Sequence, residues 1–307
     1  MEIEQYSFDT RAPPLAQGTY GSVYAGVRGP MGRAGSTFVV KRFILGRRRD
    51  EADYRGRHVR QQHFFAEMDV LQHVPPHLHL PRLLAAAQDG DDAFVVLEHG
   101  GQSLCLPDTD DIRPAIGMNT SKALAIGLQV ASAVAHLHAH GFSHGDIKPA
   151  NVLVRHDPSV VPGGVKAMLI DFGFSSRATN SFVVAPHKYG SPLFAAPDVL
   201  EGDVPHLMWP ADVWAIGCLL YYMLTGGRLP HDSQECQTLA ELRRRRSGDA
   251  RLPPMTAAAV GPSVDRIIAR ALRFSPWHRP SAADMLRVLT TVQPSGGADS
   301  PGRHRVE

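Results

Sequence analysis

The stretch HGDIKPANVLV, from His144 to Val154, sets three polar side chains directly before an apolar run. Transfer of a phosphoryl group to a hydroxyl needs a carboxylate beside the nucleophile, a cation beside the moving phosphate and a ligand for Mg²⁺. Asp146, Lys148 and Asn151 supply these three groups, and the run VLV that follows predicts a short buried strand. The stretch therefore predicts a catalytic loop for phosphoryl transfer.

A second stretch, MLIDFGF, places Asp171 and a glycine at the end of another apolar strand. A carboxylate in this position can make a second contact to Mg²⁺. A turn would explain any single aspartate of this kind equally well. It does not explain why this aspartate follows the ordered polar set of the first stretch, so the two stretches point to one site.

Two features upstream fit the same chemistry. LAQGTYGSV, from Leu15 to Val23, lies between two strand patterns, and its glycines let the backbone approach phosphates closely. Taken alone, an ordinary hairpin turn explains this stretch better. Lys41 ends the strand pattern FVVK, where a lysine on the inner face can neutralise phosphate charge. Glu67 borders the buried stripe of the helix pattern FFAEMDVL, which favours an ion pair with Lys41.

Composition narrows the class of protein. The chain has 307 residues, of which 43% are hydrophobic and 20% are charged, and its net charge is +2. These values are typical of a soluble globular protein, and so mild a charge does not favour nucleic acid or membrane as a partner. The three cysteines are scattered, which argues against a disulfide framework and structural zinc. The longest apolar run, Val213 to Leu224, is too short to span a bilayer and predicts a buried helix.

The pattern of elements predicts two lobes of a mixed α+β fold. Residues 1–12 are expected to be a frayed lead-in. Residues 13–98 form a small strand-rich lobe, and residues 102–292 form a larger, mainly helical lobe. The polar and glycine-rich tail, residues 293–307, is expected to be disordered.

Helix boundaries follow from local signals. GRRRDEADYRGR predicts an exposed loop before the helix pattern HVRQQHFFAEMDVLQHV, which ends before Pro75. The longest helix pattern, SKALAIGLQVASAVAHLHAHGF, has Ser121 as its expected N-cap and Gly141 as its expected C-cap.

From about Leu15 to about Leu289 the sequence resembles the eukaryotic-type protein kinase family, because several motifs recur in the family's order. The resemblance implies a two-lobed kinase-like domain over residues 13–292, with ATP and Mg²⁺ between the lobes. It assigns catalysis to Asp146 and Lys148, and metal binding to Asn151 and Asp171. The positions it assigns to ATP lie in the Gly-rich stretch, the lysine–glutamate pair, the segment between the lobes and one strand beside the adenine: Leu15, Ala16, Gln17, Gly18, Thr19, Tyr20, Gly21, Val23, Val39, Lys41, Glu67, Leu97, Glu98, His99 and Leu153.

Three further motifs support the resemblance. GSPLFAAPD, from Gly190 to Asp198, matches the segment that receives the substrate. Asp212 in ADVWAIG matches an aspartate that supports the catalytic loop. Arg279 in WHRP matches an arginine that pairs with the acid at Asp198, where the family usually has glutamate.

Gly145 departs from most protein kinases, which have arginine at this place, and HGD is typical of enzymes that phosphorylate small molecules. Those enzymes resemble HGDLHxxN, with histidine in place of Lys148, and they lack GSPLFAAPD and ADVWAIG. Lys148 and the GSP sequence are typical of the Ser/Thr branch. The resemblance therefore favours a serine/threonine protein kinase, with a pseudokinase scaffold and a small-molecule phosphotransferase as alternatives.

The same glycine leads to a hypothesis on regulation. In many members of the family, an arginine at this position clasps a phosphate on the activation segment. The place where that phosphate is usually carried is His187, which has no hydroxyl. We therefore expect activity without phosphorylation there, and the hydroxyls that remain in the segment are Ser175, Ser176, Thr179 and Ser181.

The expected partners are protein substrates of unknown identity, and neither nucleic acid nor a membrane is expected. Leu104 and Tyr222 occupy positions where Arg-directed members carry glutamate, so no strong preference for basic substrates is expected. The arginine runs 47–49 and 243–246 are interpreted as solvated surface. An intracellular location, cytoplasmic or nuclear, is expected, and the sequence does not predict an oligomeric state.

Overall fold

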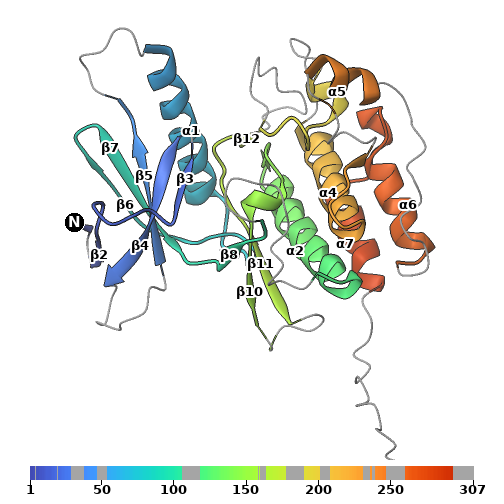
Figure 1. The fold of residues 1–307 in the computed structure, drawn as a ribbon, viewed down its shortest axis with the longest axis horizontal. Helices are drawn as coiled ribbons and strands as arrows, with labels where there is room; N and C mark the ends of the chain where they lie inside the picture. The colour runs from blue at the N-terminus through green and yellow to red at the C-terminus, as the bar shows by residue number, and fades with distance from the viewer. Residues whose placement is uncertain are drawn as a thin grey trace, which may run out of the picture.

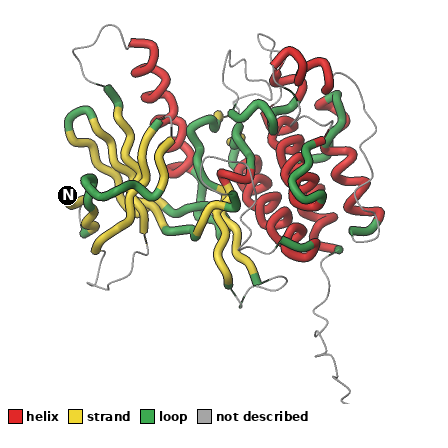
Figure 2. Tube along the Cα trace, viewed as in Figure 1, coloured by secondary structure: helices red, strands yellow, loops and turns green. Residues whose placement is uncertain are grey.

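Strands and helices separate into two lobes in the computed structural model, as Figures 1 and 2 show. The structure describes residues 1–3, 5–18, 20–28, 38–46, 54–105, 118–157, 159, 164–177, 190–200, 208–230, 236, 239–246 and 260–292. The predicted α+β fold with a small strand-rich lobe and a larger helical lobe is confirmed. The predictions for the tail and for the arginines at 47–49 lie outside the described residues.

The sheet of the first lobe is antiparallel throughout its described pairings. Its strand order is β1-β2-β4-β5-β7-β6, and β3 pairs with β4 beside this path. The strands are β1 (Glu2–Ile3), β2 (Tyr6–Phe8), β3 (Ala16–Gly18), β4 (Gly21–Arg28), β5 (Phe38–Ile44), β6 (Leu83–Asp89) and β7 (Asp92–Glu98). The helix of this lobe, α1 (Tyr54–His73), lies beside the sheet (Figure 1).

The two faces of the sheet have different coverings because side chains alternate along each strand. Phe38 and Val40 of β5 belong to a core cluster on one face. Phe43, two residues beyond Lys41, belongs to a cluster on the other face, where Phe64 and Met68 of α1 pack. Alternation therefore places Lys41 on the face that carries α1.

The predicted frayed lead-in is wrong where β1 and β2 form, at residues 2–3 and 6–8. Strands β1 and β2 join the sheet through antiparallel pairing, and β2 pairs with β4. The ring of Tyr6 lies 5.0 Å from that of Phe38, and the ring of Phe8 lies 5.4 Å from that of Phe94. The physical reason is burial: these aromatic side chains cover the sheet face that α1 leaves open.

The second lobe is built on buried helices. Its helices are α2 (Thr120–Ala139), α3 (Pro197–Leu200), α4 (Met208–Leu224), α5 (Leu239–Arg246), α6 (Pro262–Ala271) and α7 (Ala282–Thr291). Short strands lie between this bundle and the first lobe: β8 (Gln102–Ser103), β9 (Phe142–Ser143), β10 (Val152–His156), β11 (Val165–Leu169) and β12 (Ser176–Arg177). The run from Val213 to Leu224 forms most of the buried helix α4, as predicted. Among the helices of the described ranges, none has the length and apolarity needed to cross a bilayer.

Two boundaries differ from the prediction. The N-cap of α2 is Asn119 rather than Ser121, because the Asn119 side chain accepts a hydrogen bond from the backbone N–H of Lys122. The C-cap of this helix is His140, and Gly141 follows it with a φ of 79° that suits glycine. Helix α1 begins at Tyr54, inside the stretch that was predicted to be a loop.

Candidate active site

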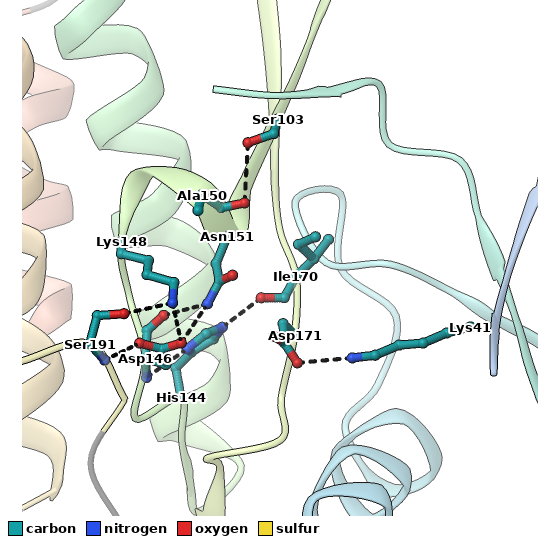
Figure 3. Close-up of polar contacts among 10 residues, drawn as sticks. All are labelled: Lys41, Ser103, His144, Asp146, Lys148, Ala150, Asn151, Ile170, Asp171 and Ser191. Atoms are coloured by element: carbon teal, nitrogen blue, oxygen red, sulfur yellow. Dashed lines mark hydrogen bonds and ion pairs between the residues drawn. The ribbon is translucent and has the colours of Figure 1, made fainter. Parts of the chain in front are cut away.

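Lys41 joins the two lobes through a pair of carboxylates. Its Nζ atom lies 2.5 Å from Oε2 of Glu67 on α1 and 2.9 Å from Oδ1 of Asp171 in the second lobe. Figure 3 shows the side chain of Lys41 pointing toward Asp171. Glu67 is buried, and the predicted pair between Lys41 and Glu67 is present. One lysine therefore fixes α1 and the segment of Asp171 at the same point.

The pKa values of Lys41, Glu67 and Asp171 depend on burial and on the charges of the other two side chains. Burial lowers the pKa of Lys41, but Asp171 and Glu67 outweigh it and hold the pKa above its ordinary value. Burial raises the pKa of Glu67 to about 6, although Lys41 opposes the shift. Partial burial also acts to raise the pKa of Asp171, but Lys41 prevails and lowers it to about 2. At neutral pH, Lys41 and Asp171 are both charged.

Asp171 has an unusual backbone conformation. Its φ is 71°, and among the described residues it is the one non-glycine with a positive φ. Such a conformation costs on the order of 1–3 kcal/mol for a residue with a side chain, and it persists only where the surroundings fix it. The side chain of Asp171 is 39% exposed while one of its oxygens holds Lys41. The surroundings thus hold a strained residue whose carboxylate is partly exposed and contacts Lys41.

The loop predicted to be catalytic converges on Asp146. Oδ1 of Asp146 accepts a hydrogen bond of 2.8 Å from the backbone N–H of Ser191. Oδ2 lies 3.0 Å from Nδ2 of Asn151 and 3.0 Å from Nζ of Lys148. Lys148 also donates to Oγ of Ser191 at 2.6 Å, as Figure 3 shows. The structure thus brings Asp146, Lys148 and Asn151 together, and it adds Ser191, to which the sequence assigned no contact.

Asp212 on α4 holds the backbone of this loop through hydrogen bonds. Its two carboxylate oxygens accept hydrogen bonds from the backbone N–H groups of His144 at 2.8 Å and Gly145 at 2.9 Å. His138 contributes a further contact to the same carboxylate at 2.9 Å, which sequence reasoning missed. The ring of His144 is buried and lies 5.4 Å from the ring of Phe172. A buried helix therefore sets the position of the loop backbone.

Gly145 has a backbone that suits glycine. Its φ is 81°, and a Cβ atom added there would lie 2.4 Å from the carbonyl oxygen of Phe174. A side chain at this position would require the backbone near Phe174 to move. The glycine of HGD thus allows the activation segment at Phe174 to pack directly against the backbone of the catalytic loop.

Most of the remaining predicted nucleotide residues lie in β3, β4, β5 and β7 of the first lobe. The hairpin of β3 and β4 pairs Gly18 with Gly21, its β3 residues are exposed, and Thr19 lies outside the described residues. Val39 is paired with Leu97, and Glu98 and His99 begin the connection to the second lobe. From the second lobe, Leu153 approaches this connection: a Cβ atom added to Gly100 would lie 2.8 Å from its Cδ1. The positions assigned to ATP that the structure describes are Leu15, Ala16, Gln17, Gly18, Tyr20, Gly21, Val23, Val39, Lys41, Glu67, Leu97, Glu98, His99 and Leu153.

Gly190 lies so close to Asp146 that a side chain at this position is expected to disturb the Asp146 carboxylate. A Cβ atom added to Gly190 would lie 2.0 Å from Oδ1 of Asp146. We expect Gly190→Ala to displace this carboxylate and to slow phosphate transfer about 10- to 100-fold, because small misplacements of reacting groups are costly. Steady-state kinetics with nucleotide binding as a second readout checks this. Leu78→Ala, whose side chain is 63% exposed, is the control. A folded Gly190→Ala variant with native transfer would contradict the expectation.

Comparison with known proteins decides the family. Residues 10–289 match the family described as the protein kinase domain. The chain belongs to this family. A mitogen-activated protein kinase kinase kinase 1 from Arabidopsis thaliana is 30% identical over 93% of this chain and 43% of its own length. Serine/threonine-protein kinase 36 from Pongo abelii is 28% identical over 91% of this chain and 18% of its own.

A bacterial relative gives a shorter match. Serine/threonine-protein kinase PkaA from Streptomyces coelicolor is 34% identical over 55% of this chain and 29% of its own length. The chain thus spans less than half the length of each of these three relatives. Members of the protein kinase family use ATP with Mg²⁺ and act on proteins, which agrees with the arrangement of Lys41, Asp146 and Asp171.

Proposed function

We propose that this chain is a serine/threonine protein kinase, which transfers the γ-phosphate of ATP to serine and threonine hydroxyls of protein substrates. The observation that carries the proposal is the set of contacts around Asp146 and Lys41. A carboxylate, two ammonium groups and a second carboxylate face one space from both lobes. Positioning and electrostatics supply most of the catalysis in phosphoryl transfer, and these groups provide both.

Each described group has a defined role in this proposal. The carboxylate of Asp146 accepts the proton of the substrate hydroxyl. The hydroxyl oxygen forms a bond to the γ-phosphorus, and the bond from that phosphorus to ADP breaks. Lys148, 3.0 Å from Asp146, neutralises charge on the transferring group. Lys41 pairs with the phosphates of the nucleotide while Glu67 holds it in place. Asp212 fixes the backbone on which Asp146 stands.

The residues present fit a magnesium ion bound together with a nucleotide. Nδ2 of Asn151 donates to both the backbone and the side chain of Asp146, so the amide oxygen of Asn151 remains as an acceptor. With the carboxylate of Asp171 it offers the oxygen ligands that Mg²⁺ prefers. In the described part of the chain, no three His, Cys, Asp or Glu side chains form a metal site of their own. The ion would therefore be held jointly with phosphate oxygens, whose charge it would neutralise.

The contacts of Ser191 support the choice of the Ser/Thr branch. Its hydroxyl accepts from Lys148, and its backbone N–H donates to Asp146. Ser191 thereby ties the segment that receives the substrate to both catalytic side chains. All charged groups of the site are retained and paired, which disfavours a scaffold without transfer.

Nucleotide binding tests the first half of this proposal. We expect ATP to bind in the presence of Mg²⁺, and removal of Mg²⁺ with a chelator to weaken binding. Lys41→Met removes a charge-assisted contact, worth about 1.5–3 kcal/mol, and should weaken affinity roughly 10- to 100-fold. Titration calorimetry gives these affinities. Lys122→Met, in the first turn of α2 in the second lobe, is the matched control. Equal affinity in the native and Lys41→Met proteins would contradict the assignment of Lys41.

We also propose that transfer does not require phosphorylation of the activation segment. Gly145 offers no side chain to clasp a phosphate, and Ser175 is buried, with its hydroxyl donating to the carbonyl of His144. Ser176 lies in β12, where its hydroxyl is 3.0 Å from that of Ser143. Thr179, Ser181 and His187 lie outside the described residues. Phosphatase treatment should leave activity unchanged, whereas loss of activity and its return with a phosphate between residues 174 and 189 would refute the idea.

A further inference from the structure

The ring of His63 lies between two other aromatic rings that come from distant parts of the chain. Tyr20, at the turn of the Gly-rich hairpin, stacks on it with ring centroids 3.6 Å apart and an angle of 19° between the planes. Phe174, directly after the Asp171–Gly173 motif, meets it edge-on at 4.5 Å and 77°. The three rings therefore connect the hairpin of β3 and β4, helix α1 and the start of the activation segment.

His63 is the centre of this cluster and is itself buried. It is only 4% exposed, and a Cβ atom added to Gly173 would lie 2.6 Å from its Nδ1. His63 precedes Glu67 by four residues, so both side chains lie on the same face of α1. The helix that presents Glu67 to Lys41 is thus braced one turn earlier by the ring of His63.

Tyr20 brings the Gly-rich turn over the reacting groups. Its pKa is raised by burial and then by the charges of Asp171 and Asp146, which agrees with a ring that covers the space above these carboxylates. Tyr20 also lies 6.1 Å from Phe174 in an edge-on arrangement. Closure of the turn and contact with the activation segment therefore occur together in this structure.

A second tie between α1 and the activation segment is much weaker. Arg177 of β12 lies 3.0 Å from Asp69 of α1, but their side chains are 46% and 38% exposed. An ion pair this open to water contributes little. Of these two ties, the aromatic cluster around the buried ring of His63 is therefore the stronger.

We propose that His63 is a positioning residue that holds the Gly-rich turn closed through Tyr20 and fixes α1 against the activation segment through Phe174. This inference rests on the proposed function, because its kinetic effect is measured on ATP. The contacts of His63 would align Glu67 with Lys41 without a phosphate group on the activation segment. The three rings act as one unit, so removal of either His63 or Tyr20 releases the turn.

Coupling between the two rings tests the proposal. We expect His63→Ala and Tyr20→Ala each to raise the KM for ATP about 10-fold, because the groups that position the phosphates are no longer held. The double variant should be no worse than either single variant, since both break the same unit. His63→Phe keeps an aromatic ring and should restore most of the lost affinity. Phe65→Ala, on the same helix with its side chain 62% exposed, is the control and should behave as the native protein.

Amide hydrogen exchange of the nucleotide-free protein gives a readout that does not depend on catalysis. His63→Ala should speed exchange in three regions at once: residues 20–28, the first half of α1 and residues 171–177. Multiplied effects in the double variant, or faster exchange in α1 alone, would overturn the proposal. If the native protein transfers no phosphate but His63→Ala speeds exchange in all three regions, the proposed function fails and the positioning role of His63 stands. If the native protein is active but the effects of the two single variants on the KM for ATP multiply in the double variant, the positioning role of His63 fails and the proposed function stands.

Discussion

Replacement of Asp146 by asparagine is expected to slow phosphate transfer by about 10²- to 10⁴-fold, the range typical of general acid–base catalysis. The carboxylate accepts hydrogen bonds from the backbone N–H of Ser191 and from Asn151, and it lies 3.0 Å from Nζ of Lys148. An amide has nearly the same shape but cannot take up the proton of a substrate hydroxyl. Affinity for ATP should change little, because Lys41 and Asp171 are untouched. Single-turnover kinetics separates the two quantities.

The matched control for this variant is Asp89→Asn. Asp89 is the exposed last residue of β6 in the first lobe, whereas Asp146 belongs to the second lobe. It should therefore leave both transfer and binding unchanged. Native transfer rates in a folded Asp146→Asn protein would show that this carboxylate is not the catalytic group.

Replacement of Arg279 by alanine is expected to cause the largest loss of stability. The guanidinium is fully buried and lies 2.5 Å from Oδ1 of Asp198, so the shorter acid does reach it, as predicted. It also donates to the carbonyl oxygens of Arg273, Pro210 and Phe274. Removing one partner of a buried ion pair costs about 3–5 kcal/mol, because the remaining charge and acceptors stay buried without a partner. Urea denaturation should show this decrease in the free energy of unfolding.

Arg287→Ala is the control for the Arg279 variant. Arg287 pairs with Asp284 at 2.9 Å on the surface of α7, and its side chain is 73% exposed. A surface change of this kind should stay within about 0.5 kcal/mol. Equal stability of the Arg279→Ala and Arg287→Ala proteins would contradict the role of Arg279 as an anchor between α4 and the segment of Asp198.

The helical lobe was the easier part of the fold to predict. Its helices carry long apolar patterns, and α4 lies where its pattern places it. Strand β6 was missed because its sequence, LLAAAQD, is rich in alanine, which has little preference for strands. Strands β1 and β2 were missed because short segments show no clear period, and the burial and pairing that stabilise them exist only in the folded sheet.

The candidate site divides in a similar way. Lys41, Asp146, Asn151 and Asp171 lie in motifs whose order is informative, so the sequence could place them in one site. The contact of His138 with Asp212 joins residues 74 positions apart, and no motif marks it. The cluster of Tyr20, His63 and Phe174 is likewise a product of tertiary packing. Contacts of this kind follow from the packed fold and leave no pattern along the chain.

The central claim is that this chain transfers phosphate to serine and threonine in proteins. The most direct test gives the purified protein labelled ATP and Mg²⁺ with a mixed protein substrate, and in parallel with small hydroxyl compounds. We expect label on serine and threonine of the protein substrate, and its disappearance in Asp146→Asn. Bound ATP with no labelled protein would contradict the claim in favour of a scaffold. Label on small hydroxyl compounds alone would contradict it in favour of the class of enzymes that shares the glycine of HGD.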